Sequence, residues 1–313
     1  MQISLNRRSF SPDPAISRRF FLAVAGAASL RMASAAGTAP VGLALFTVQD
    51  ELLKDLPGTL RAVAKMGYQS VDFTSNYNGP LLGYFGWTTQ QAKDVRRTLD
   101  DLGIRCNTTH NDGPSLTAEG LPKAIEINHI IGSKYLVVSG NRNPVLGISG
   151  GKLTVGAGKP TGLEGWKGVA DQPASFSGKI KAGGLRLGYH NHPGEFTPID
   201  GKRPMDVIAA NTPKEVMLQL CVGACVSAQS DPVAWIKANP GRFQSIHCKD
   251  WAPGADRGFD TLFGEGVSPW PQIFAAAESV GGVEEYLIEQ LRSPFPSFET
   301  AHRCMANWKK VKG

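Results

Sequence analysis

The chain has 313 residues, 42% of them hydrophobic and 19% charged, and carries a formal net charge of +6. This length suffices for one large core or two modest ones, and the ordinary composition excludes disordered and fibrous classes. Five arginines and one aspartate in residues 1–35 account for +4 of the charge, which leaves about +2 on the remainder. No Lys/Arg cluster stands out there, so the charge gives no support for nucleic-acid binding.

The first 35 residues differ in kind from the rest. Residues 17–22 read SRRFFL, an apolar run continues to Leu30, and small residues follow at 33–35. This order predicts a twin-arginine signal peptide over 1–35, recognised by the twin-arginine export machinery and cleaved in the bacterial periplasm. A membrane anchor is the weaker alternative, because the apolar run falls short of the ~20 residues that span a bilayer. We therefore expect a periplasmic protein with its folded domain at 36–313 and no stable membrane anchor.

The cysteines are odd in number and form no CxxC pair. They are Cys106, Cys221, Cys225, Cys248 and Cys304. In an oxidising compartment a disulfide framework would use an even number, so at least one thiol is free or bound to a ligand. Cys106 and Cys248 lie within apolar strand patterns and are predicted to be core residues.

Short apolar segments of strand length alternate with segments of helical periodicity from residue 41 onward. The predicted strands are 41–47, 70–73, 105–109, 134–139, 185–189, 216–221, 243–247 and 286–289. The predicted helices are 55–66, 88–102, 121–131, 163–182 with a break at Pro173, 204–210, 232–238, 270–280 and 298–311. Eight such pairs predict an α/β fold, a single (β/α)8 TIM barrel. A doubly wound sheet is less favoured, because no glycine fingerprint follows the first strand.

A long glycine-rich segment at 141–159 separates the fourth strand from the next helix. Its Gly151-Lys152 pair lacks the serine or threonine and the glycine spacing of a phosphate-binding P-loop. We predict a mobile active-site loop there.

Polar side chains follow the strands at the end where barrel enzymes carry their sites. They are Asp72, His110, Asp112, His190, His192, Gln219, Cys221, His247, Lys249 and Glu289. A histidine alone is more often structural, but histidines, a thiol and a glutamate on four adjacent strands favour a divalent metal site. Such a metal polarises a carbonyl while a nearby glutamate moves the proton alpha to it.

Several stretches resemble one known family. They read GYHNHPGEF at 188–196, DPVAW at 231–235, SIHCKD at 245–250, FGEG at 263–266 and YLIEQ at 286–290. On these motifs the chain resembles the sugar phosphate isomerase/epimerase family of xylose-isomerase-like TIM barrels, in particular its exported branch. The motifs cover nearly all of the chain after the leader, and they are not specific for one substrate.

The resemblance implies one divalent metal ion held by four side chains from strands five to eight. By position these are His190, Cys221, His247 and Glu289. The family usually has glutamate and aspartate where this chain has His190 and Cys221. A thiolate prefers zinc or iron over the manganese or magnesium that oxygen ligands favour. Cys221 therefore implies a changed metal preference, a weakened site kept by three ligands, or lost turnover.

The remaining assignments concern proton transfer and substrate contact. Glu289 is both a predicted ligand and a predicted proton shuttle. Glu195 is the second acid/base candidate or the residue that orients His192. Lys249 and His110 would bind sugar hydroxyls or a carbonyl, although Lys249 could instead pair with a carboxylate such as Asp72.

A second group completes the predicted substrate contacts, which include Asp72 and His192. Trp251, Trp87 and Tyr84 would supply an apolar face for a sugar ring or pack within loops. Asp250 faces away from His247 by strand alternation and is predicted to be a structural acceptor.

The leading expectation is a metal-dependent isomerase or epimerase of a non-phosphorylated keto-sugar or oxidised sugar, acting by alpha-proton abstraction through an enediolate. The alternatives are a 3-keto-glycoside lyase or hydratase using the same site, and a non-catalytic sugar-binding protein whose metal site decayed at Cys221. A homodimer is compatible with the sequence.

Overall fold

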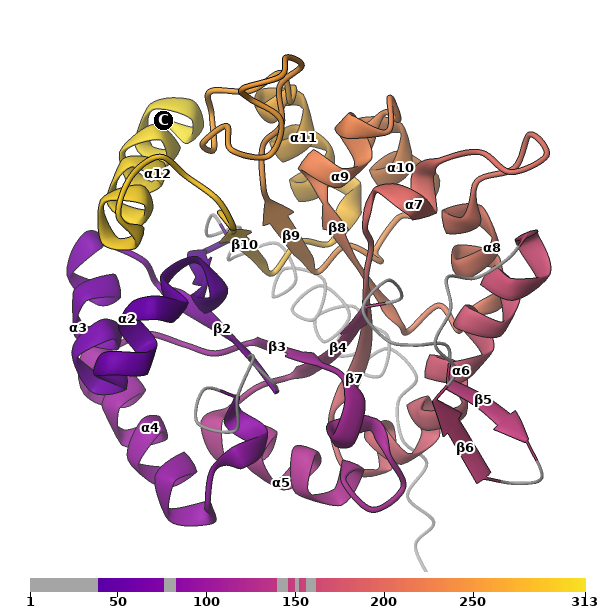
Figure 1. Ribbon diagram of the computed structural model, residues 1–313, viewed down its shortest axis with the longest axis horizontal. Helices are drawn as coiled ribbons and strands as arrows, with labels where there is room; N and C mark the ends of the chain where they lie inside the picture. The colour runs from indigo at the N-terminus through magenta and orange to yellow at the C-terminus, as the bar shows by residue number, and fades with distance from the viewer. Residues whose placement is uncertain (1–38, 76–82, 140–145, 150–151, 156–161) are drawn as a thin grey trace, which may run out of the picture. The chain divides into compact units, whose positions relative to one another are not determined.

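The computed structural model describes residues 39–75, 83–139, 146–149, 152–155 and 162–313. The predicted signal peptide lies outside these residues. Within them, eight parallel strands close into a barrel in the order β1-β10-β9-β8-β7-β4-β3-β2, with helices around the outside (Figure 1). The predicted (β/α)8 TIM barrel is confirmed.

The strands are short, as expected for buried barrel strands whose neighbours cover both faces. They are β1 (Val41–Ala44), β2 (Ser70–Thr74), β3 (Thr108–Asn111), β4 (Tyr135–Ser139), β7 (Arg186–His190), β8 (Met217–Cys221), β9 (Ser245–Cys248) and β10 (Glu285–Ile288). A separate antiparallel hairpin, β5 (Leu146–Ser149) with β6 (Lys152–Val155), lies within the segment predicted to be a mobile loop. The rest of that segment lies outside the described residues.

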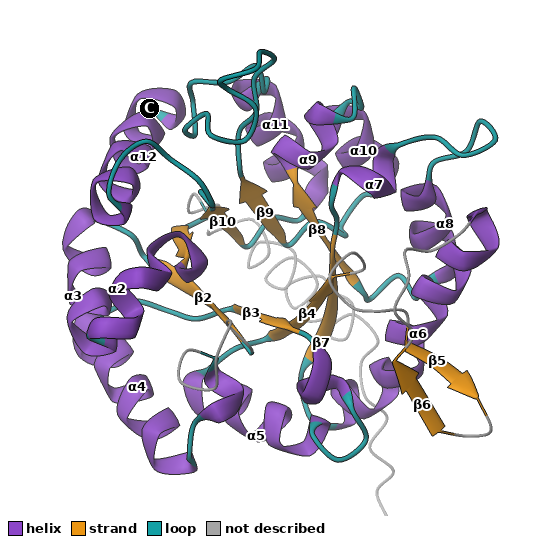
Figure 2. Ribbon diagram, viewed as in Figure 1, coloured by secondary structure: helices purple, strands orange, loops and turns teal. Residues whose placement is uncertain are grey.

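Helices form the outer layer of the barrel (Figure 2). They are α2 (Gln49–Lys54), α3 (Leu56–Met66), α4 (Thr89–Leu102), α5 (Leu121–Ile131), α6 (Gly162–Ala182), α7 (Pro193–Phe196), α8 (Pro204–Asn211), α9 (Val222–Ser227), α10 (Pro232–Ala238), α11 (Trp270–Ala276) and α12 (Ser297–Lys312). Single turns of 3-10 helix are η1 (Leu45–Val48), η2 (Tyr84–Gly86) and η3 (Gly113–Leu116), and η4 (Ala277–Gly281) is a π-helix that continues α11. Among the described helices, none is long and apolar enough to cross a membrane.

Local signals set several helix ends where the sequence predicts them. Thr88 caps α4 through a reciprocal capping box with Gln91, and Gly103 ends the same helix in the left-handed region at φ +65°. The prediction of a break at Pro173 is wrong, because α6 runs without interruption from Gly162 to Ala182. The third strand also begins three residues later than predicted, at Thr108.

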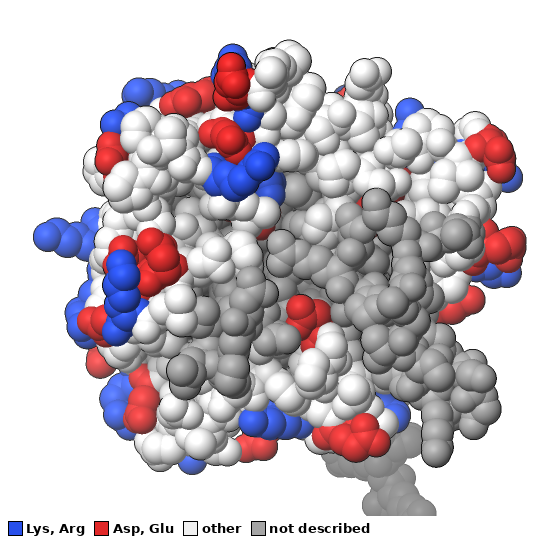
Figure 3. All heavy atoms as spheres, in the orientation of Figure 1, with Lys and Arg blue, Asp and Glu red and all other residues white. Residues whose placement is uncertain are grey.

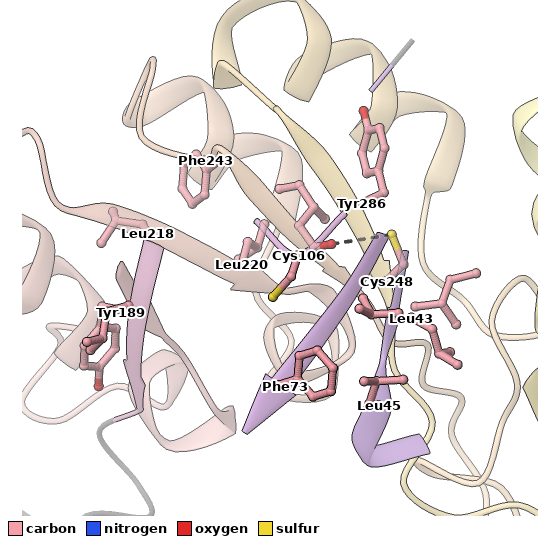
Figure 4. Packing of buried hydrophobic residues seen from close by; sticks show 14 of the residues in the cluster. Leu43, Leu45, Phe73, Cys106, Tyr189, Leu218, Leu220, Phe243, Cys248 and Tyr286 are labelled. Carbon is pink, nitrogen blue, oxygen red and sulfur yellow. Dashed lines mark hydrogen bonds between the residues drawn. The ribbon is translucent and has the colours of Figure 1, made fainter. Parts of the chain in front are cut away.

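Apolar strand residues that face outward pack against the helices and form the core (Figure 4). Cys106 and Cys248 belong to this core, as predicted. All five cysteines are buried and free. Tyr84 and Trp87 are also buried core residues in edge contact, which leaves them outside the cavity described below.

The charged residues of the surface are mixed in sign. In the view of Figure 3, Lys and Arg alternate with Asp and Glu around the periphery of the described part. Many are paired along one helix, such as Arg303 with Glu299 on α12 and Arg97 with Asp94 on α4. Exposed pairs of this kind contribute little stability.

Candidate active site

A cavity of about 310 Å³ lies at the carboxyl ends of the barrel strands. Besides Tyr84 and Trp87, ten residues are predicted as metal ligands, acid/base groups or substrate contacts, and eight of these ten line it. They are Asp72, His110, His190, His192, Cys221, His247, Lys249 and Glu289. The two others, Glu195 and Trp251, do not line it.

Strand register places the histidines and the thiol side by side. Cys221 of β8 pairs with His247 of β9, and His190 of β7 pairs with Gln219 of β8. Because the strands are parallel and alternate in side-chain direction, their inward polar residues meet at one end of the barrel.

His190 is buried and held in one orientation. Its Nδ1 lies 2.9 Å from Oε1 of Gln219, and the Gln219 amide nitrogen donates to the Ser245 hydroxyl at 3.0 Å. Nδ1 is therefore the protonated nitrogen, and Nε2 is left with its lone pair. Burial and the neighbouring rings of His247 and His110 hold the pKa of His190 well below its usual value, so the ring is neutral.

His247 lies between two carboxylates. Its Nδ1 is 3.3 Å from Oε2 of Glu289, and its Nε2 is 4.0 Å from Oδ2 of Asp72. The latter distance is too long for a hydrogen bond, and among the described residues the buried Nε2 has no hydrogen-bond partner. Burial alone would lower the pKa of His247, but the carboxylates of Asp72 and Glu289 raise it to about 9.

His110 and Asp72 form the third fixed pair. Nδ1 of His110 lies 3.1 Å from both carboxylate oxygens of Asp72. Asp72 is buried in the middle of β2, and its Oδ2 also accepts a hydrogen bond from Thr108 at 2.8 Å. These contacts let Asp72 orient His110, and the predicted contact of Asp72 with the substrate stays a prediction.

Lys249 contacts Glu289 and an aromatic ring. Its Nζ lies 3.6 Å from Oε2 of Glu289 and 5.3 Å from the centre of the Phe259 ring. The structure thus pairs Lys249 with Glu289, where the alternative from sequence was Asp72. Burial would raise the pKa of Glu289, but the Lys249 ammonium and His247 outweigh burial and hold it well below its usual value. Glu289 is therefore ionised.

Cys221 is buried at the wall of the cavity. Its backbone N–H donates to Oδ1 of Asn191 at 3.0 Å, which ties the end of β8 to the segment after β7. Burial raises the pKa of the Cys221 thiol to about 12. A metal that used this sulfur would have to displace its proton.

The donors available to a divalent cation form two groups that share His190. One consists of His110, His190 and His247, and the other of His190, Cys221 and Glu289. In each group one donor atom per residue lies within 4.8 Å of the others. With the buried Nε2 of His247 lacking a partner, these nitrogen, sulfur and carboxylate donors fit a transition-metal ion.

Glu195 lies behind the cavity wall on α7. Its Oε1 accepts a hydrogen bond from the Tyr189 hydroxyl at 2.9 Å, and Oε2 is buried without a partner. Burial raises the pKa of Glu195 to about 7. The role of Glu195 as a second acid/base stays a prediction, since the described contacts do not bring it to the cavity.

Trp251 follows β9 in a segment organised by Asp250. Asp250 is buried and accepts hydrogen bonds from backbone nitrogens of Trp251, Gly264 and Gly266, at 2.9, 3.0 and 3.2 Å, and from the Trp270 indole at 2.8 Å. The prediction that Asp250 is a structural acceptor is confirmed. The contact of Trp251 with a substrate stays a prediction.

The apolar part of the cavity was not found from the sequence. Phe46, Phe259 and Leu291 line it. Phe46 lies in η1, because β1 ends at Ala44 and not at residue 47 as predicted, and the other two lie in turns or loops. Loops carry no hydrophobic periodicity that would have singled them out. Gln219 was noted at a strand end, but its contact with His190 depends on register that sequence alone does not fix.

The chain belongs to the xylose isomerase-like TIM barrel family, whose model matches residues 60–301. No curated protein matches the chain significantly.

Three solved structures illustrate the likeness. A sugar phosphate isomerase/epimerase from Parabacteroides distasonis ATCC 8503 is 25% identical, with a TM-score of 0.65 over 87% of this chain and 94% of that one. An L-ribulose 3-epimerase is 12% identical, with a TM-score of 0.60 over 88% and 96% of the two chains. The IOLI protein with a bound zinc atom is 16% identical, with a TM-score of 0.60 over 87% and 96%. At such low identities, the likeness to the last two structures shows a shared fold alone.

Proposed function

We propose that the protein is a metal-dependent isomerase or epimerase of a non-phosphorylated keto-sugar or oxidised sugar. The observation that carries the proposal is the convergence of His190, His247, Glu289 and Lys249 on one cavity at the carboxyl ends of the strands. Membership of the family and the likeness to a sugar phosphate isomerase/epimerase support the reaction class.

The metal would be held by donors from the two groups that share His190. When bound, a divalent metal polarises a substrate carbonyl and stabilises the negative charge that develops on its oxygen. The zinc in the IOLI protein structure supports a metal on this fold.

Glu289 is the proposed base. Its carboxylate is ionised, borders the cavity and is held by His247 and Lys249. Glu289 would take the proton from the carbon beside the carbonyl, and the C–H electron pair would move to form the enediolate. Return of a proton to the neighbouring carbon gives the isomer, and return to the opposite face of the same carbon gives the epimer.

The cavity favours an uncharged substrate. Among its described lining residues, Lys249 is the one Lys or Arg, and Asp72, Asp112 and Glu289 contribute three carboxyl groups. A phosphate group would need several cationic or backbone N–H donors around it, and the one ammonium is already beside Glu289. The apolar side chains of Phe46 and Phe259 suit one face of a sugar ring.

The proposal is tested by incubating the metal-loaded protein with a panel of free keto-sugars and oxidised sugars in deuterated water. Proton NMR would show loss of the signal from the exchanged C–H and the appearance of the signals of an isomer that carries deuterium at the re-protonated carbon. Glu289→Gln should abolish exchange, while Glu119→Gln, at an exposed position on the chain, should not. Unchanged exchange in Glu289→Gln would refute the mechanism, and a released aglycone would indicate lyase or hydratase chemistry instead.

We also propose that the protein is exported through the twin-arginine machinery to the periplasm, on the basis of the SRRFFL stretch at 17–22. An exported address fits a substrate without phosphate, since sugar phosphates are made in the cytosol.

A further inference from the structure

Three histidines from separate parts of the barrel surround one point of the cavity. His110 is on β3, His190 on β7 and His247 on β9. The ring centres are 4.9 Å apart for His110 and His190, 5.1 Å for His110 and His247, and 4.6 Å for His190 and His247. Each ring offers one nitrogen within 4.8 Å of the nitrogens of the other two.

Every ring of this three-histidine cluster has its Nδ1 next to a fixed acceptor. The acceptors are Asp72 for His110 at 3.1 Å, Gln219 for His190 at 2.9 Å and Glu289 for His247 at 3.3 Å. An acceptor on one ring nitrogen fixes the proton there and leaves the other nitrogen to bind a metal, which is how metal-binding histidines are ordinarily oriented. At His247, whose pKa is raised by the two carboxylates, a metal would displace the second ring proton. Within the part of the chain that the structure describes, the buried Nε2 of His247 has no hydrogen-bond partner, as expected of a nitrogen directed at a ligand.

The four ligands predicted from sequence do not form one such group. His247 groups with His110 and His190, whereas Cys221 groups with His190 and Glu289. The two groups have only His190 in common, so they are compared below as alternative donor sets for one ion.

The electrostatics favour the histidine cluster over the group that contains Cys221. Lys249 Nζ lies 3.6 Å from Glu289 Oε2, so a cation bound to Glu289 would lie close to an ammonium. The histidine cluster instead has the buried carboxylate of Asp72 beside it, 3.1 Å from His110 and 4.0 Å from His247. Asp72 thus supplies negative charge without being required as a ligand.

We propose that the divalent metal is held by His110, His190 and His247, with Cys221 beside the centre and not bound to it. His110 thereby replaces the strand-six ligand that Cys221 no longer supplies. Three imidazoles with a further position open to substrate form a typical catalytic zinc set, and imidazole selects zinc, copper, nickel or iron over magnesium. The inference rests on the proposed function only in requiring that the site binds a divalent metal.

The first test is the absorption spectrum of the Co²⁺-substituted full chain. A cobalt–thiolate bond gives an intense charge-transfer band in the near ultraviolet, and a set of imidazoles does not. We expect visible bands of a low-coordinate cobalt centre without the thiolate band, and the same spectrum for Cys221→Ser. A thiolate band that disappears in Cys221→Ser would overturn the proposal.

The second test is metal affinity, measured by competition with a chromogenic chelator. Loss of a ligand in His110→Ala should weaken Zn²⁺ binding by about 100-fold or more, and loss of the outer acceptor in Asp72→Asn by about 10- to 100-fold. His192→Ala is the matched control, because His192 lies in the same cavity with its ring 5.2 Å from His190 but belongs to neither donor group. Circular dichroism confirms that each variant is folded.

The outcomes separate this inference from the proposed function. Unchanged Zn²⁺ affinity in His110→Ala, or an equal loss in His192→Ala, would overturn the three-histidine centre while leaving a metal-dependent isomerase intact. If the folded wild-type chain binds no divalent metal, both the proposed metal-dependent function and this inference are refuted.

Discussion

Thr108 Oγ1 lies 3.0 Å from Oε1 of Glu285 in the barrel interior. The same hydroxyl lies 2.8 Å from Oδ2 of Asp72. A hydroxyl has one hydrogen, so Thr108 donates to only one of the two carboxyl groups. The other carboxyl group must be protonated and donate to the hydroxyl oxygen. Asp72 is flanked by His110 and His247, which favour its ionised form. Glu285 is therefore the neutral acid, and it holds Asp72 in place through Thr108.

This arrangement makes stability depend on pH through Glu285. Burial, together with the charge of Asp72, raises the pKa of Glu285 to about 7 from an ordinary 4.5. The native state therefore keeps this proton up to about pH 7, while the unfolded chain loses it near pH 4.5. The stabilising effect of the proton is fully present below the unfolded pKa and is lost as the pH rises through the folded pKa.

Replacing Glu285 by glutamine should remove this dependence, because the amide donates to Thr108 and does not titrate. The difference in unfolding free energy between Glu285→Gln and wild type should therefore shift in favour of the variant by on the order of 3 kcal/mol as the pH rises from 4.5 to 8. Urea unfolding at a series of pH values measures the difference, with the exposed Glu119→Gln as control. A difference between Glu285→Gln and wild type that stays constant with pH would contradict a neutral Glu285.

Asp250 should be one of the most sensitive structural positions in the chain. Its carboxylate accepts from the backbone N–H groups of Gly264 and Gly266 and from the indole of Trp270. A Cβ at Gly266 would come within 2.1 Å of Asp250 Oδ1, so the loop closes tightly on this carboxylate. In Asp250→Asn, an NH2 group would face N–H donors, which should cost about 3 kcal/mol of unfolding free energy.

The measurement for Asp250→Asn is the urea midpoint, compared with that of Asp256→Asn on the exposed part of the same loop. The control should unfold within about 0.5 kcal/mol of wild type. Equal effects of the two substitutions would show that the Asp250 contacts do not stabilise the loop.

The site residues that sequence analysis places correctly in the cavity are those at strand ends. His190, Cys221, His247 and Glu289 follow apolar runs whose period-two alternation fixes their direction, and parallel strands bring them to one rim. Glu195 shows where this reasoning stops. It lies near His192 in the sequence, but its carboxyl, on the short helix α7, accepts a hydrogen bond from Tyr189, and its acid/base role stays a prediction.

Contacts between separate strands could not be predicted from the sequence, for a different reason. The grouping of His110 with His190 and His247 depends on barrel closure and on rotamers set by Asp72 and Gln219. No local pattern encodes these distances. The apolar lining residues Phe46 and Phe259 come from turns and loops, where tertiary contacts decide side-chain direction.

Export can be tested without knowledge of the substrate. Replacing both Arg18 and Arg19 by lysine keeps the charge but removes the twin-arginine pair, so the full-length precursor should accumulate in the cytoplasm. Cell fractionation and the size of the protein in each fraction measure the effect. Arg7→Lys with Arg8→Lys is the matched control outside the SRRFFL stretch, and the prediction fails if both double variants are exported equally.

Removal of the metal should destabilise the folded barrel and weaken sugar binding. At a free Zn²⁺ concentration about 1,000-fold above its Kd, binding to the native state contributes about 4 kcal/mol of unfolding free energy. Chelation should therefore lower the melting temperature, and added Zn²⁺ should restore it. His190→Ala removes the donor common to both groups and should abolish the restoration. If the chelator changes neither sugar binding nor the melting temperature of the wild-type chain, the result would instead support a non-catalytic sugar-binding protein.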